Sequence, residues 1–128
     1  MKLFVEISPG ELLDKITILE IKLANITEAA KLANVRREYD LLTAVLNEEV
    51  RAGDALARLR AELKSVNAEL WTIEDAIRAE ERAGRFGAEF IALARSVYRA
   101  NDRRAALKRE INLLLDSALV EEKSYAPY

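Results

Sequence analysis

The chain has 128 residues, of which 51% are hydrophobic and 33% charged, and it contains only four Gly and two Pro. This length predicts one domain, and a composition with few helix breakers and many Ala, Leu, Glu, Lys and Arg predicts helix. The chain contains no Cys and no His, which excludes disulfides, thiol nucleophiles and histidine acid–base catalysis and leaves only carboxylates as metal ligands.

The net charge of −2 gives no general attraction to nucleic acid or to a membrane surface. Residues 1–11 show no secretory signal, and no segment approaches about 18 uncharged apolar residues. We therefore expect a cytoplasmic protein with no membrane span and no nucleic-acid partner.

The first predicted elements are an extended segment and a helix start. Residues 1–7 contain "KLFVEI", whose β-branched and aromatic residues favour an extended chain. In the next residues, Ser8 and Glu11 have the spacing of a capping box, and Pro9 suits the first helical position. The sequence therefore predicts that a helix begins at residue 9.

No Gly or Pro occurs between residues 11 and 52, so we expect a first long helix over residues 9–50. Two apolar stripes follow each other along it: Leu12, Ile16, Leu19, Leu23, Ile26 and then Leu32, Val35, Tyr39, Leu42, Leu46. The step from Ile26 to Leu32 fits neither a three- nor a four-residue stride, so the helix is predicted to be kinked or broken near residue 27. At a break, Thr27 could cap a second helix.

Two more long helices are predicted over residues 55–83 and 88–116, separated by the turn "GRFG". The first carries a seam typical of a coiled coil: Leu56, Leu59, Leu63, Val66, Leu70, Ile73, Ile77. Similar lengths and a short connection favour an antiparallel hairpin. Residues 117–128 are predicted to be an extended tail.

The fold class that we expect is all-α: a single domain over residues 1–128, built as an antiparallel bundle of three long helices with short extended ends. If the first helix turns back, the segments "KLFVEI" and "ALVEEK" come to the same end and could pair. Ile18 and Ile21 lie off the first apolar stripe, so that helix is apolar on two sides. We therefore expect a homodimer that packs through such faces, although an intrachain bundle could cover both.

A first group of candidate site residues lies in the first helix: Asp14, Lys15, Glu20 and Lys22. These side chains could hold an anion or a protein partner, or they could simply form a solvated face. Glu11 and Asp14 lie one helical turn apart, as carboxylates do in helical Mg²⁺-dependent phosphohydrolases. No second pair with this spacing stands out, so we expect no metal site.

A second group lies in the last helix, where Arg104 takes a seam position at which Leu would be usual. Arg104 could line a polar pocket for a phosphate or carboxylate together with Asn101 and Lys108. It could instead make a structural ion pair, with Glu69 on the facing helix as the expected partner.

Aromatic residues complete the list of candidates. Trp71, with Glu74 nearby, suits either an interface anchor or the edge of the core. Tyr125 could serve as an anchor in the tail.

Four stretches in this order resemble a family of short bacterial proteins that is classed as a domain of unknown function: "SPGELLDKITILEIK", "LWTIEDAIR", "FIALARSVYRANDRRAALKREIN" and "VEEKSY". The resemblance covers nearly the whole chain and assigns no residue a role. It also implies a second-rank hypothesis, an accessory protein of surface-glycan synthesis that binds an anionic ligand or partner.

The leading hypothesis is a non-enzymatic, homodimeric module for assembly or protein interaction, with no catalytic residue and no cofactor. The third hypothesis, after the accessory protein of surface-glycan synthesis, is a Mg²⁺-dependent phosphohydrolase.

Overall fold

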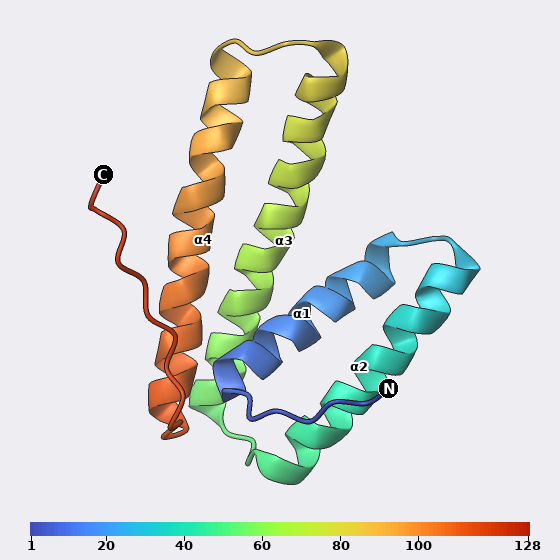
Figure 1. Ribbon diagram of the computed structural model, residues 1–128, viewed down its shortest axis with the longest axis vertical. Helices are drawn as coiled ribbons and strands as arrows, with labels where there is room; N and C mark the ends of the chain where they lie inside the picture. Colours follow the sequence, from blue (N-terminus) through green and yellow to red (C-terminus); the bar gives the residue numbers. More distant parts are fainter.

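The computed structural model describes residues 1–128 and is all-α, as predicted, with no strand (Figure 1). Its four helices are α1 (Pro9–Asn25), α2 (Ala29–Glu49), α3 (Asp54–Ala83) and α4 (Ala88–Leu114). The prediction of three long helices is therefore wrong, because residues 9–50 form two helices that pack against each other.

The chain turns back between α1 and α2. Ile26 and Glu28 both adopt extended backbone angles, and the Ile26 N–H closes α1 on the Lys22 carbonyl. Thr27 does not cap α2: Glu28 occupies the N-cap position and makes no side-chain cap hydrogen bond. The reversal places Leu42 and Leu46 of α2 on the core beside α1, whereas a straight helix would carry this stripe away from the core.

α3 and α4 form the long antiparallel hairpin of the molecule (Figure 1). Gly84 ends α3 in the left-handed region, with φ of 67°, a conformation that glycine adopts without steric cost. α4 ends at Leu114, two residues before the predicted end. There Asp116 has φ of 52°, and the Ser117 N–H donates to the Asn112 carbonyl at 2.8 Å, which closes the helix as a Schellman motif.

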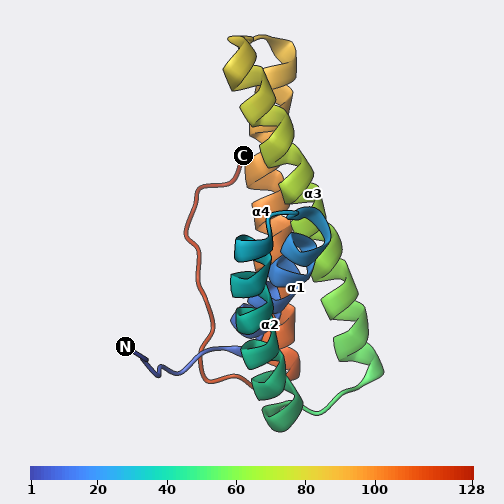
Figure 2. The ribbon, with the colours of Figure 1, turned by 90° about the vertical axis from the view of Figure 1, so that its right-hand side faces the viewer.

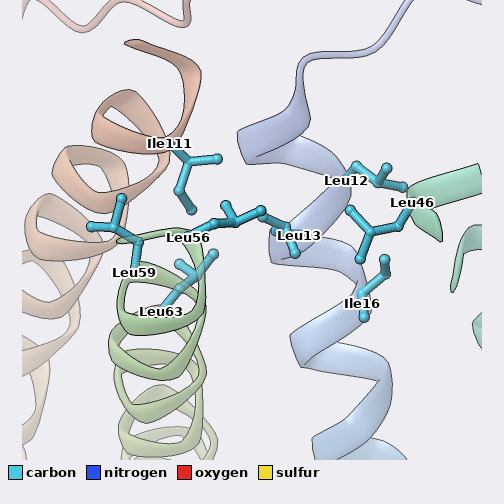
Figure 3. Close-up of a cluster of buried hydrophobic side chains, with 8 residues drawn as sticks. All are labelled: Leu12, Leu13, Ile16, Leu46, Leu56, Leu59, Leu63 and Ile111. Atoms are coloured by element: carbon cyan, nitrogen blue, oxygen red, sulfur yellow. The ribbon is translucent and has the colours of Figure 1, made fainter. Parts of the chain in front are cut away.

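α1 is the central element, because it packs against each of the other three helices. It crosses the lower part of the α3–α4 hairpin, and α2 packs on its other side (Figure 1). The main hydrophobic core fills this crossing and consists of Leu12, Leu13, Ile16, Leu46, Leu56, Leu59, Leu63 and Ile111 (Figure 3). Both apolar sides of α1 thus gain neighbours within the chain near its start, where Leu13 and Ile16 are fully buried.

The start of α1 lies against the end of α4. The Gly10 N–H, which has no partner within its own helix, donates to Asn112 Oδ1 at 2.7 Å. A Cβ at Gly10 would lie 2.5 Å from the Lys108 carbonyl oxygen, so only glycine allows this approach. Ser8 accepts from the Glu11 N–H at 3.2 Å, as half of the predicted capping box requires.

Both extended segments lie on the same side of the bundle (Figure 2). They do not pair as strands, since no backbone–backbone hydrogen bond involves residues 1–7 or 118–128. Of the four helices, none combines the length and the apolar character that crossing a membrane demands.

Candidate functional site

The most buried charged group of the protein is Asp14, on α1, whose exposed fraction is 1%. Arg104 reaches it from α4 in a bidentate pair: Nε donates to Oδ1 at 2.8 Å and Nη2 donates to Oδ2. The predicted partner, Glu69, instead accepts from Arg103 at 2.7 Å, on the exposed side of the hairpin. The prediction of an Arg104–Glu69 pair is wrong because α1 fills the space that Arg104 faces.

Asn67 of α3 completes the coordination of Asp14. Its Nδ2 donates to Asp14 Oδ1 and to Thr17 Oγ1, both at 3.0 Å. All three residues are buried, so one polar cluster joins α1, α3 and α4. Asn67 and Thr17 are not among the predicted site residues, and the only signal for them in the sequence is that each neighbours a core position, Val66 or Ile16.

Lys108 lies one helical turn beyond Arg104 and is also buried. Its Nζ lies 2.8 Å from Glu11 and 3.0 Å from Glu121, and 4.0 Å from Asp14. Lys108 therefore connects α4 to the first turn of α1 and to the C-terminal tail.

The charges of the cluster are held in their ionised forms. Burial raises the pKa of Asp14, but hydrogen bonds from Arg104 and Asn67 and the charges of Arg104 and Lys108 outweigh it, so the pKa lies below its usual value. The hydrogen bond to Asp14 raises the pKa of Arg104. Burial lowers the pKa of Lys108, but its hydrogen bonds to Glu11 and Glu121 raise it by more, so the pKa lies above its usual value. None of these three shifts moves a pKa toward neutral pH, where a general acid or base works best.

A notch opens beside the cluster where α1 departs from the hairpin. Its volume is about 490 Å³, within the range of small-molecule sites. Trp71, Ile18 and Leu70 form apolar walls, and the polar lining includes Asn67, Asn101, Arg104, Lys22, Glu74, Asp75 and Arg78. Asn101 accepts weakly from Arg104 Nη1, at 3.5 Å.

The structure thus brings together seven of the ten predicted site residues, in the cluster or in the notch: Asp14, Lys22, Trp71, Glu74, Asn101, Arg104 and Lys108. Three others lie elsewhere. Lys15 is exposed, Glu20 lies 3.5 and 3.6 Å from Arg60 and Lys64 of α3, and Tyr125 lies on the exposed tail. Tyr125 lines a separate groove against α4, which it shares only with Asn101 among the predicted residues.

The carboxylates do not assemble into a metal centre. No group of three or more acidic side chains is placed to hold an ion. Glu11 and Asp14, the pair with the spacing for Mg²⁺, both face Lys108. A neighbouring ammonium opposes the binding of a second cation there.

Comparison with known proteins gives a family and no relative of known function. No curated protein and no solved structure matches the chain. The match to a family covers residues 1–127, and the chain belongs to that family, which is described as "Family of unknown function (DUF6165)".

Proposed function

We propose that this protein is a non-enzymatic, cytoplasmic helical interaction module that works as a homodimer. The observation that carries this proposal is its surface area. One chain of 14.4 kDa exposes 8970 Å², whereas a compact monomer of this mass exposes about 6,800 Å². The excess, roughly 2,000 Å², matches what each partner buries in a large homodimer interface.

The state of the polar cluster supports an assembly role over a catalytic one. Arg104 and Lys108 are each paired with carboxylates of the same chain. Asp14 is saturated by its own neighbours and buried. Such a network fixes the angle at which α1 crosses the hairpin, and it holds the charges of Asp14, Arg104 and Lys108 in pairs with one another or with Glu11 and Glu121.

The test is the mass of the protein in solution. Light scattering after size exclusion, and sedimentation velocity over a hundredfold range of concentration, should give twice the chain mass of 14.4 kDa at the upper concentrations. A chain that remains monomeric across the whole range contradicts the proposal.

A second candidate function is the binding of a small anionic molecule in the notch, as an accessory protein of bacterial surface-glycan synthesis would do. Lys22 favours it, since this cation lines the notch together with Trp71 and makes no ion pair. Thermal shift and calorimetry with inorganic phosphate, nucleotides and sugar nucleotides test it.

Two lysines of α1 make a matched pair for that experiment. Lys22→Gln should remove any stabilisation by the anion. Lys15→Gln, on the same helix but outside the notch, should leave it intact. Equal effects of the two substitutions would contradict binding in the notch.

A further inference from the structure

The N-terminal arm, residues 2–7, is the least covered apolar part of the chain. Leu3, Phe4 and Val5 have exposed fractions of 80%, 92% and 83%. The arm projects from the helices into solvent, and none of its backbone groups bonds to another part of the backbone (Figure 2). An extended apolar segment with free N–H and C=O groups is a template for pairing with another strand.

The sequence of the arm alternates in the way of a half-buried strand. In an extended chain, Leu3, Val5 and Ile7 lie on one face, and Lys2, Phe4 and Glu6 lie on the other. The first face is wholly apolar. The second has an aromatic ring between two opposite charges.

This second face is complementary to itself. Suppose that two arms run antiparallel with Phe4 opposite Phe4. The numbers of any two residues that lie opposite each other then add up to eight. Lys2 then lies opposite Glu6 of the second copy, and Leu3 lies opposite Val5. One register thus gives two opposite-charge pairs and one aromatic pair, which are favourable cross-strand neighbours.

We propose that the N-terminal arms of two copies pair as an antiparallel two-stranded ribbon centred on Phe4, and that this ribbon is the core of the interface. The inference rests on the homodimer proposed above and names where it forms. A second copy is the occupant because the pairing obeys two-fold symmetry, in which the same patch serves both partners. An unrelated strand would carry charges complementary to both Lys2 and Glu6 only by chance.

The ribbon needs a surface for its apolar face, since two strands alone are marginally stable in water. α2 offers Leu41 and Val45 for this, which are 64% and 42% exposed in one chain. Leu46 is the only buried residue of α2, so this helix has most of its surface left for a partner.

Disulfide crosslinking tests the register, because the chain contains no cysteine of its own. Phe4→Cys places two thiols opposite each other, within the Cα separation that a disulfide spans. Lys2→Cys is the matched control: the two substituted positions lie four residues out of register, roughly 14 Å apart. Mild oxidation should convert the first variant to covalent dimer and leave the second largely monomeric on non-reducing gels.

Charge exchange gives an independent test that does not depend on a thiol. Lys2→Glu and Glu6→Lys each create two like-charge contacts in the ribbon, so each should weaken the dimer about tenfold or more. The double variant restores both opposite-charge pairs with their order reversed, and its dimer should regain most of the lost affinity. Sedimentation velocity measures all four proteins, and circular dichroism confirms that each is folded.

The outcomes separate this inference from the proposed function. A monomeric wild-type chain overturns both. If the wild type is a dimer and a variant without residues 2–6 is still a dimer, the arm pairing is overturned and the homodimer has another interface. The same holds if the double charge variant dimerises with no higher affinity than the single variants. Equal crosslinking of the two cysteine variants refutes the antiparallel register.

Discussion

Replacement of Arg104 by leucine tests the polar cluster directly. The substitution leaves Asp14 buried, with Asn67 as its remaining hydrogen-bond donor and Lys108 Nζ at 4.0 Å. Breaking a buried ion pair by removing one partner costs about 3–5 kcal/mol. Because Arg104 is 29% exposed and two partners of Asp14 remain, we expect the free energy of unfolding to fall by about 2–4 kcal/mol at neutral pH.

The pH dependence gives this loss a signature. Without Arg104, only Asn67 and Lys108 remain to offset the effect of burial, so the pKa of Asp14 in the folded variant should be higher than in the wild type. The loss in the free energy of unfolding is then full at neutral pH. It shrinks as the pH falls through the raised pKa of Asp14, because a protonated carboxyl can be buried at lower cost. The gap in stability between wild type and Arg104→Leu should therefore narrow in acid.

Urea denaturation followed by the fluorescence of Trp71, at a fixed protein concentration and several pH values, measures both effects. Arg103→Leu is the matched control: its pair with Glu69 is about half exposed, so its loss should stay within about 1 kcal/mol. The double variant Asp14→Leu/Arg104→Leu should recover much of the lost stability, since no buried charge is left unpaired. Arg104→Leu at or above wild-type stability would refute the cluster as described.

Further predictions concern the corner where α1 meets α4. Gly10→Ala should lower the free energy of unfolding by about 1–3 kcal/mol, because its Cβ would clash with the Lys108 carbonyl, whereas Gly53→Ala, with open space around its Cβ, should be neutral or slightly stabilising; urea denaturation compares the two. In the wild-type chain, the stability that Asp14 contributes through its lowered pKa is fully present above its unfolded-state pKa, and it should be lost as the pH falls through the folded value, as acid titration followed by circular dichroism will show. Glu121→Gln removes a half-exposed partner of Lys108, so global stability should change by less than about 1 kcal/mol while limited proteolysis of the tail becomes faster.

The helix ends show how far local signals reach. Ser8 and Gly84 mark the start of α1 and the end of α3 with side-chain and backbone chemistry that can be read in the sequence. The break at residues 26–28 has no Gly or Pro, and its only trace is a slip in the phase of the apolar stripes. That slip predicts a discontinuity but not its angle, because the choice between kink and reversal depends on what α2 packs against.

The site illustrates a different limit, that of partners distant in the chain. The register of the hairpin correctly places Glu69 beside the helical turn of α4 that contains residues 103 and 104, but the residue that contacts it is Arg103. Arg104 points one position further round the helix, toward Asp14, which lies 90 residues away on α1. Heptad spacing within a hairpin cannot predict this contact, since it depends on how a third helix crosses the other two.

The polar cluster and the arm are connected through the first turn of α1. A buried ion pair is weak support for stability, because apolar residues of similar volume often stabilise a core as well or better. Its directional bonds do restrict geometry, and here they fix α1 against α4 through Asp14–Arg104, while Lys108 and Asn112 hold Glu11 and Gly10. The arm leaves the bundle directly before this fixed turn, so the direction of its last residues, which precede Ser8, is set before a partner arrives. In the proposed dimer, such preorganisation lowers the entropy lost when two arms pair. The cluster would then contribute to dimer affinity without touching the partner.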